Sequence, residues 1–381
     1  MSTAVAPEAA GSPDAAASEG GGAVPPAGGG PASGAGFRAV LRAHRQLVAW
    51  VVFVVALLVY VAFLGIPYST DDILLWITAA LFCATISDLG RWRRGIIRDW
   101  LPLYAVLAFY SLLRGYASHL WFAAHWSPQV RFDEWIGRGV APTVRLQNAL
   151  FDPTNLHVWD YLAWCTYMTH FFASFVIAGV LWVKDHDRFR RFVPLFVGLT
   201  FAGYLTYVLY PAMPPWMVSA NGSMEPSARI IPVMWNHIGF HQAAALFEGN
   251  ATFDNDVAAV PSLHAAYPML ICLFFWGRAR PWLRVLLAGY VVAMATTLVY
   301  TGEHFVFDIL LGWTYAVVTF VVGSRLLDRR DARKAAKAAR GGPAADPQAD
   351  AGVDDGGPPR ARAGDGHRPV GASAATATAE P

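Results

Sequence analysis

The sequence predicts an all-α protein, a polytopic bundle of about eight transmembrane helices with disordered termini. Apolar runs close to the length of about twenty residues that crosses a bilayer recur along the middle of the chain. Of the 381 residues, 55% are hydrophobic and 15% are charged, whereas a soluble domain carries about 25% charged residues. The basic residues also gather beside alternate apolar runs, as they do in the cytoplasmic loops of membrane proteins.

Two terminal segments lack the large apolar side chains that a folded segment needs. Residues 1–36 are mainly Ala, Gly, Pro and Ser, and residues 331–381 begin with basic side chains and continue with a similar composition. Because such segments cannot offset the entropy of ordering, we expect a disordered N-terminal tail and a basic, then disordered C-terminal tail around a membrane domain, 37–330. No secretory signal pattern opens the chain, and the first apolar run is long enough to remain uncleaved.

The apolar runs set the expected order of the helices. The sixth and seventh are short and are separated by Pro281, so they are expected to be two helices and not one. No internal repeat is evident, which argues against an inverted-repeat transporter. The predicted spans are approximately 46–66, 71–89, 99–119, 158–183, 192–211, 262–277, 283–301 and 305–326.

The distribution of positive charge predicts the orientation. Most of the 29 Lys and Arg residues lie beside the same alternate ends of the runs. Because cytoplasmic loops are enriched in these residues, we expect a multi-pass protein of the cell membrane with both termini in the cytoplasm. The opposite, extracytoplasmic ends carry few cations: Arg114, Arg131, Arg138, Arg145 and Arg229.

Other features of the composition exclude some classes of function. The net charge of +2 gives no reason to expect binding to nucleic acid. The cysteines Cys83, Cys165 and Cys272 each lie within an apolar run. They are therefore expected to be small buried side chains, neither a disulfide framework nor a metal cluster.

Two long loops are predicted on the extracytoplasmic side. The first, 121–157, mixes apolar and polar residues and is expected to include a helix along the membrane interface. The second, 211–260, opens with Pro211, Pro214 and Pro215, which cannot be helix interior. Tryptophans gather on this side and are expected to form an anchoring belt: Trp121, Trp126, Trp135, Trp159, Trp216 and Trp235.

Polar residues open the sixth apolar run. Ser262 and His264 follow Pro261 directly, and proline suits the first position of a helix, so the motif is expected in the opening turn. The backbone N–H groups and the helix dipole at such a turn favour an anion. The hydroxyl and the imidazole add hydrogen-bond donors for phosphate oxygens and a proton for a leaving group.

His304 and Asp308 are four residues apart at the start of the eighth run. This spacing places them on one face of a helix, where an aspartate can hold an imidazole in one tautomer and stabilise it when it is positive. The predicted topology puts this pair on the same side of the membrane as Ser262 and His264. A lone histidine at a helix end is more often a packing residue, so the combination of the two motifs carries the prediction of a catalytic site.

His170 lies about three turns into the fourth apolar run. An ionisable group at that depth is a functional candidate, and it is equally consistent with a hydrogen bond to a neighbouring helix. We treat His170 as a candidate substrate-binding residue.

The sequence of Pro261, Ser262, Leu263 and His264, followed by Gly302, His304 and Asp308, resembles the type-2 phosphatidic acid phosphatase (PAP2) superfamily. Leu263, where phosphatases of the main branch have Gly, and the proline-rich segment 210–216 resemble the branch of the fungal inositol phosphorylceramide synthases and many bacterial relatives. The resemblance covers about 101–326, which we expect to be the PAP2-like catalytic core.

The resemblance implies roles for the motif residues. His304 would attack phosphorus and form a phosphohistidine, with Asp308 orienting it. His264 would protonate the departing oxygen and later activate water or an acceptor hydroxyl. Ser262 would hold a phosphate oxygen, and neither a metal nor another cofactor is needed.

The sequence departs from the main branch at the phosphate clamp. Where that branch has Ser-Arg ahead of the attacking histidine, this chain has Thr297 and Leu298. Lys184 and Arg191 match the spacing of an upstream clamp motif, but the predicted topology places them across the membrane. A metal-free phosphoryl transfer needs cationic donors, so we expect Arg114 first and Arg229 second as substrate-binding residues.

The favoured function is therefore a metal-independent membrane phosphatase or phosphotransferase. It would act on a lipid phosphate ester at the extracytoplasmic face, and the sequence leaves hydrolysis and transfer to an alcohol open. Coding bias in the tails weakly favours isoprenoid or glycerolipid phosphates as substrates. The alternative is a non-catalytic lipid-binding or transport protein that retains a PAP2-like site. The sequence makes no prediction of the oligomeric state.

Overall fold

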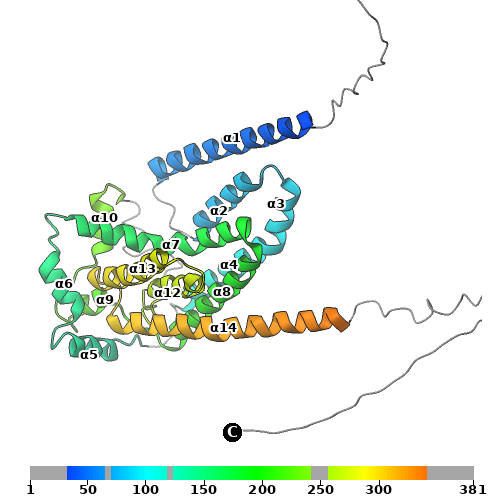
Figure 1. Cartoon of the computed structure of the whole chain (residues 1–381). Helices are drawn as coiled ribbons and strands as arrows, with labels where there is room; N and C mark the ends of the chain where they lie inside the picture. The colour runs from blue at the N-terminus through cyan, green and yellow to red at the C-terminus, as the bar shows by residue number, and fades with distance from the viewer. Residues whose placement is uncertain (1–31, 65–69, 118–122, 242–255, 341–381) are drawn as a thin grey trace, which may run out of the picture. The chain divides into compact units, whose positions relative to one another are not determined.

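The computed structural model describes residues 32–64, 70–117, 123–241 and 256–340, and the regular elements among these residues are helices (Figure 1). The chain divides into two compact units, Met1–Leu327 and Asp328–Pro381. Every site described below belongs to the first unit. The described part of the second unit is the C-terminal end of the last helix.

Each predicted apolar run contains a helix. Five of these helices, α1, α7, α8, α13 and α14, are long and apolar enough to cross a membrane, and α2 and α12 are apolar but shorter. The all-α membrane bundle is thus confirmed, and the number of spans stays a prediction. The bounds are α1 (Ala32–Leu64), α2 (Thr70–Thr85), α4 (Leu101–Ala117), α7 (Val158–Lys184), α8 (His186–Leu209), α12 (Leu263–Trp276), α13 (Pro281–Tyr300) and α14 (Val306–Arg340).

The helical segment is longer than the predicted membrane domain. Helix α1 begins at Ala32 and α14 continues to Arg340, several residues beyond the predicted limits at 37 and 330. The rest of the predicted tails, 1–31 and 341–381, lies outside the described residues. The domain boundaries and the disorder of the tails therefore stay predictions.

Short helices form the connections. Helix α3 (Leu89–Gly95) and the π-helix η1 (Ile96–Trp100) lie between α2 and α4. The first predicted outer loop contains two helices, α5 (Ser127–Ile136) and α6 (Pro142–Leu150), where one was expected. Arg138 and Gly139, both at positive φ, separate them. The second loop contains α9 (Pro215–Ala220) and α10 (Ile230–His237), and its residues 242–255 lie outside the described part.

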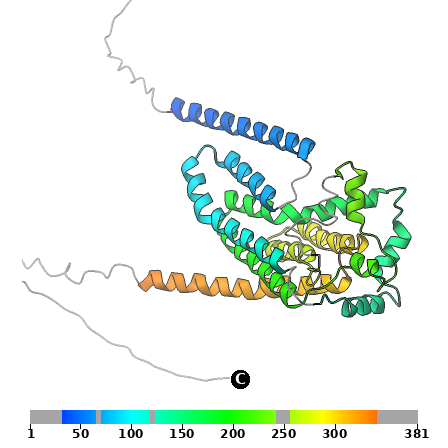
Figure 2. The ribbon, with the colours of Figure 1, turned by 180° about the vertical axis from the view of Figure 1, so that it is seen from behind.

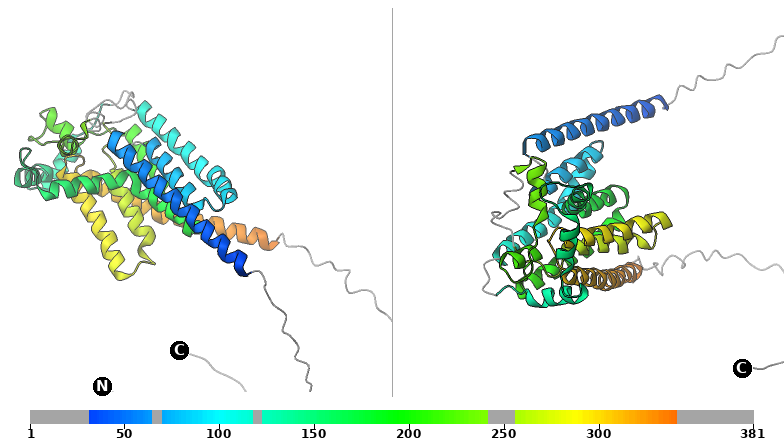
Figure 3. Two further views of the ribbon diagram at one scale, coloured as in Figure 1. Left: turned by 90° about the horizontal axis from the view of Figure 1, so that it is seen from above. Right: turned by 90° about the vertical axis from the view of Figure 1, so that its left-hand side faces the viewer.

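Helix α12 lies inside the bundle. It forms a hairpin with α13 and packs on α7 and α8 (Figures 2 and 3). Its residues Ala265 and Ala266 are fully buried, and Leu270 is 1% exposed. Because much of α12 contacts protein and not lipid, its short length does not leave polar backbone exposed to a bilayer.

Threonine–tyrosine hydrogen bonds join the long helices across this apolar interior. Such side-chain bonds stabilise membrane helix pairs because an unpaired hydroxyl group in an apolar environment is unfavourable. They join α7 to α13, α8 to α12 and α8 to α14. The pairs are Thr169 with Tyr290 at 2.7 Å, Thr200 with Tyr267 at 2.8 Å, and Thr206 with Tyr315 at 2.7 Å.

Two expectations about single residue types are wrong in part. Trp235, expected in an interfacial belt, is fully buried in α10 and packs against Trp164 with ring centroids 5.0 Å apart. Cys165 is exposed, whereas Cys83 and Cys272 are buried as expected. Both differences arise because hydropathy alone does not tell which face of an apolar segment meets protein.

Two glycines provide a matched test of the packing. A Cβ atom at Gly312 in α14 would lie 2.3 Å from the carbonyl oxygen of Ser262, whereas one at Gly289 in α13 would meet nothing within 4 Å. Gly312→Ala is therefore expected to lower the free energy of unfolding by about 1–3 kcal/mol. Gly289→Ala is expected to leave it unchanged or raise it by up to about 1 kcal/mol. Thermal unfolding in one detergent measures the difference, and equal midpoints would contradict this close approach.

Candidate active site

The two motif histidines lie side by side. His264 is in the first turn of α12, and its Nδ1 atom is 3.2 Å from the Nε2 atom of His304, which precedes α14. His304 is 5% exposed, so a group must come between the start of α12 and the start of α14 to contact its ring. Residues forty positions apart in the sequence are thus brought into direct contact.

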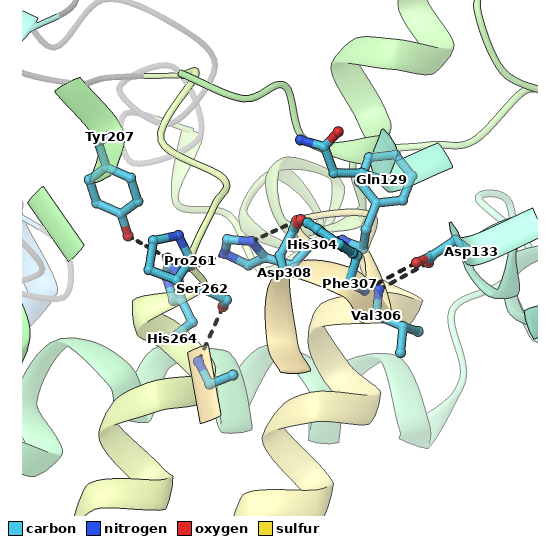
Figure 4. Close-up of polar contacts among 12 residues, drawn as sticks. Gln129, Asp133, Tyr207, Pro261, Ser262, His264, His304, Val306, Phe307 and Asp308 are labelled. Atoms are coloured by element: carbon cyan, nitrogen blue, oxygen red, sulfur yellow. Dashed lines mark hydrogen bonds and ion pairs between the residues drawn. The ribbon is translucent and has the colours of Figure 1, made fainter. Parts of the chain in front are cut away.

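Asp308 sets the orientation and tautomer of His304 (Figure 4). Its buried carboxylate places Oδ2 3.4 Å from Nδ1 of His304 and 2.9 Å from the backbone nitrogen of Phe305. An ionised carboxylate only accepts hydrogen bonds, so Nδ1–H of His304 donates to it. The Nε2 atom of a neutral His304 then accepts a hydrogen bond from Nδ1–H of His264. The lone pair on Nε2 of His304 therefore points toward His264.

The expected shared helix face of His304 and Asp308 is wrong, because α14 begins only at Val306. His304 lies in the turn before the helix, and Gly302 in this turn has a φ of +77°. Asp308 lies in the first helical turn, and its side chain accepts the backbone N–H of Phe305, as the acidic residue of a capping box does. The expected contact is present, but a cap and a turn produce it.

Ser262 is the N-cap of α12, not a residue of its opening turn. Its Oγ atom accepts the backbone N–H of Ala265 at 3.2 Å, and the helix begins at Leu263. Pro261, expected at the first helical position, lies outside the helix because the serine oxygen provides the cap. The backbone N–H of Ser262 donates to the carbonyl oxygen of Asp308 at 3.0 Å. The two motif segments are therefore joined through their main chains.

His170 packs directly on the histidine pair. Its ring centroid lies 3.8 Å from that of His264, and Tyr267 stacks on His170 at 5.2 Å. Tyr167, one turn earlier on α7, stacks on His264 at 5.0 Å. Helix α7 therefore covers the ring of His264, and the structure places His170 beside the site.

Of the five arginines predicted on the extracytoplasmic side, Arg229 is the one whose described contacts lie next to the motif residues. Its Nε atom donates to Oε1 of Glu303 at 2.9 Å, and its Cζ atom lies 4.5 Å from the ring centroid of Trp216. The Arg229 and Glu303 side chains are 17% and 7% exposed. Burial lowers the pKa of Arg229, but the Glu303 carboxylate more than offsets this effect, so the pKa lies above its ordinary value. Because Glu303 directly precedes His304, the ion pair borders the histidine pair.

The other outer arginines do not contribute a described contact to the site. Arg114 belongs to α4, and its side chain lies outside the described part of the structure. Arg131, Arg138 and Arg145 are exposed on or beside α5 and α6. The structure therefore describes the surroundings of Arg229, whereas the role predicted first for Arg114 stays a prediction.

Metal binding has no evident ligand set in the described residues. No group of three or more His, Cys, Asp or Glu side chains among them is placed to hold a metal ion. The expectation that the reaction needs no metal stays a prediction. The groups that the site does bring together are the imidazoles of His264 and His304 and the carboxylate of Asp308, with Glu303 of the Arg229–Glu303 ion pair next to His304 in the chain.

Comparison with protein families settles the relationship. The family model of the PAP2 superfamily matches residues 130–322, about half of the 381-residue chain, including both motif histidines. The chain belongs to the PAP2 superfamily. The match begins in α5 and ends in α14, inside the range expected from the sequence.

Individual relatives point to one branch of the PAP2 superfamily. A phosphoinositol dihydroceramide synthase of Bacteroides thetaiotaomicron is 31% identical over 144 residues, which are 35% of this chain and 45% of the relative. The inositol phosphorylceramide synthase catalytic subunits of Schizosaccharomyces pombe and Saccharomyces cerevisiae are both 27% identical, over 187 and 183 residues. These two alignments cover 47% and 46% of this chain, and 43% and 44% of the relatives.

The expected branch is thereby confirmed. The chain spans less than half the length of each of these relatives. No solved structure matches it significantly.

Two residues of this PAP2 site were not predicted from the sequence. Gln147 of α6 donates through Nε2 to the carbonyl oxygens of Ala228 and Tyr300, at 2.9 and 2.8 Å. Its Oε1 atom accepts the N–H of Ala228 at 2.7 Å, so the segment before Arg229 is held against the end of α13. Glu303 holds Arg229 itself. Glu303 adjoins a motif histidine and could have been noticed, whereas the partners of Gln147 are 81 and 153 residues away.

The buried ion pair gives a stability test. Arg229→Ala leaves the Glu303 carboxylate buried without its partner, which is expected to lower the free energy of unfolding by about 3–5 kcal/mol. Adding Glu303→Gln removes the uncompensated charge and is expected to recover much of that loss. Chemical unfolding of the single and double variants measures the coupling.

Arg145→Ala serves as the control for this test, because Arg145 is exposed on α6. Its substitution is expected to change the free energy of unfolding by less than about 0.5 kcal/mol. Additive effects of Arg229→Ala and Glu303→Gln would contradict a coupled pair.

Proposed function

We propose that this protein is an integral-membrane phosphotransferase that moves a phosphate-bearing group of a lipid phosphate ester through a phosphohistidine at His304. One observation carries the proposal: Nε2 of His304 lies 3.2 Å from His264 while its Nδ1 contacts Asp308. A nucleophile, an acid–base and an orienting carboxylate are thereby within reach of one phosphorus atom. Membership of the PAP2 superfamily supports it, as do the relatives named as synthases of phosphoinositol-bearing ceramides.

In the first step, Nε2 of His304 attacks phosphorus, and the N–P bond forms as the P–O bond to the departing alcohol breaks. His264 enters this step as the imidazolium and gives one proton to the departing oxygen, so a neutral alcohol leaves and His264 becomes a neutral imidazole. The ring of His304 becomes positive, and Asp308 stabilises it through Nδ1–H. A phosphorus atom bonded to Nε2 of His304 takes the place of the 3.2 Å contact between this atom and Nδ1 of His264.

In the second step, an acceptor hydroxyl gives its proton to His264 while its oxygen attacks phosphorus and the N–P bond breaks. Water as the acceptor gives hydrolysis, and an alcohol gives transfer. We favour transfer because the relatives are named as synthases. A phosphoinositol lipid as donor with a ceramide-like acceptor is the first pair to test, ahead of isoprenoid or glycerolipid phosphates.

Other residues would bind the substrate. The Arg229 guanidinium supplies positive charge for the oxygens of the transferred group, which carry the negative charge in the transition state. The hydroxyl of Ser262 donates its proton to one of these oxygens while its lone pair keeps the N-cap. His170 holds the ring of His264 in place and borders the substrate. Arg114 is the second candidate for the cation.

We place the site at the extracytoplasmic face of the cell membrane. The site lies at the start of α12, whereas Arg188 at the start of α8 lies over the ring of Phe275 near the other end of α12, at 4.7 Å. Arg284, near the start of α13, is likewise at the end of that helix remote from His304. Basic residues therefore gather at the opposite ends of these helices, which the positive-inside rule assigns to the cytoplasm.

Substitution of the histidines tests the proposed chemistry. Purified protein is incubated with phosphatidylinositol, phosphatidate and a polyprenyl diphosphate, each with and without a ceramide acceptor, and all products are quantified. His304→Ala is expected to lower kcat by about 10³-fold or more, because it removes the nucleophile. His264→Ala is expected to lower kcat by about 10²–10⁴-fold, because it removes the acid–base.

The matched control is His237→Ala, since His237 is exposed at the end of α10. It is expected to retain wild-type turnover. Unchanged turnover in His304→Ala would rule out the phosphohistidine mechanism. Lipid binding without turnover in the wild type would favour the non-catalytic alternative. Free phosphate or a free phosphorylated head group without acceptor product would make the protein a hydrolase.

Chelation tests the expected independence of metal. Because the histidine pair, Asp308 and Arg229 supply the nucleophile, the proton and the positive charge, wild-type turnover is expected to change by less than about twofold in excess EDTA. The measurement is the rate of product formation before and after dialysis against EDTA. Loss of activity that returns on addition of a divalent cation would contradict this mechanism.

A further inference from the structure

Asp133 of α5 is a fully buried carboxylate that the mechanism above does not use. Its Oδ2 atom accepts the backbone N–H of Val306 at 3.0 Å, and its Oδ1 atom accepts that of Phe307 at 3.1 Å. Figure 4 shows both bonds leaving the same carboxylate toward the start of α14. The partners are 173 and 174 residues away in the sequence.

These bonds complete the hydrogen bonding at the start of α14. The first backbone N–H groups of a helix have no partner within the helix. Phe305 donates its N–H to Asp308, and Val306 and Phe307 donate theirs to Asp133. Two carboxylates from separate elements thus occupy the positive end of this helix, the place where a free anion would otherwise bind.

Packing around Asp133 holds the same turn. Phe305 is fully buried in one cluster with Val130 of α5, and Phe132 of α5 contacts the ring of Phe307 edge to face, with centroids 5.5 Å apart. Helix α5 lies beside the start of α14 in both views of the chain (Figures 1 and 2). The contacts of α5 therefore fall on the residues that directly follow His304.

The carboxyl group of Asp133 is not a source of stability in its ionised form. Burial raises the pKa of Asp133 to about 7, the two N–H donors act against this rise, and nearby Asp308 adds to it. A folded pKa above the unfolded value means that ionisation of Asp133 weakens the fold as the pH rises through about 7. An uncharged residue at position 133 would avoid this loss of stability. The presence of an aspartate there therefore needs an explanation other than stability.

We propose that Asp133 is a positioning residue that fixes the first turn of α14 and thereby the nucleophile His304. This inference rests on the proposed function and assigns α5 a part in it. His304 is separated from Val306 by a single residue, and its orienting partner Asp308 lies in the turn that Asp133 holds. Because a misplacement of about 1 Å can cost about 10²-fold in rate, a loosened turn affects the chemical step more than substrate binding.

Asp133→Asn tests this role, because the amide has the shape of the carboxyl group but presents only one acceptor oxygen. The variant is expected to lower kcat by about 10²-fold with KM changed by less than about threefold. The matched control is Glu134→Gln on the same helix, where Glu134 is partly exposed. This control is expected to keep wild-type kcat and KM.

A second measurement needs no turnover. Amide hydrogen exchange of the full-length protein in detergent is followed at Val306 and Phe307 by mass spectrometry with fragmentation. Asp133→Asn is expected to speed exchange at one or both of these amides by about tenfold or more, because their protection depends on the carboxylate. Glu134→Gln is expected to leave both rates unchanged.

The outcomes separate this inference from the proposed function. If the wild type turns over no substrate, the proposed function fails, and the exchange rates still show whether Asp133 holds the turn. Unchanged exchange at both amides, unchanged kcat, or a rise in KM at constant kcat would each overturn the positioning role.

A variant of the partner covers the case in which Asp133→Asn does not fold. Val306→Pro removes one of the two donors while proline suits the first position of α14. It is expected to lower kcat by about tenfold, because the bond from Phe307 to Asp133 remains. Wild-type kcat in Val306→Pro would contradict the proposal.

Discussion

Asp308 is fully buried, and its interactions join the segments that carry the two histidines. Its carboxylate accepts hydrogen bonds from the side chain of His304 and the main chain of Phe305, and its carbonyl oxygen accepts the N–H of Ser262. Removing the side chain would disturb the tautomer of His304 and the start of α14 together. The close approach of Gly312 to the carbonyl of Ser262 supports the same junction one helical turn further along. The geometry of the histidine pair therefore depends on both the side chain and the main chain of Asp308.

The arrangement places several acidic groups around a site that is proposed to bind phosphate. Asp308 and Asp133 are both fully buried, and their carboxyl oxygens accept backbone N–H groups at the start of α14. Glu303 is compensated by Arg229. Two carboxylates at the start of a helix already interact with the positive end of its dipole, so a further anion there is disfavoured. This supports the proposal that the positive charge for the phosphate group comes from the start of α12 and from Arg229.

Long apolar runs and short motifs were the features of the sequence that allowed the helices and the candidate site to be predicted. Hydropathy located the long helices, and motif spacing with a shared topology singled out His264, His304 and Asp308. The start of α14 was misplaced because the side chain of Asp308 caps the turn, an interaction that the spacing alone does not distinguish from a shared helix face. Asp133 and Gln147 could not be predicted, since their bonds join residues 173 and 153 positions apart and they lie on the short helices α5 and α6, which carry no motif.

The missing arginine of the main branch has a physical explanation in this fold. Leu298, which stands at that position, is fully buried in a cluster with Met294, Trp235 and Ile309. Burying a guanidinium group among these apolar side chains would remove its hydration and would be strongly unfavourable. Only the main chain of Leu298 serves the site, because its carbonyl oxygen accepts the N–H of His304 at 3.2 Å.

The cation that we propose in its place, Arg229, belongs to the loop before α10. Gln147 and the backbone bond from Ile230 to Thr301 hold this loop against the turn that carries Glu303. Arg229 is thereby fixed at both ends, by its backbone and by its ion pair. The proposed phosphate site then needs no arginine on α13, and that helix packs its apolar face against α12.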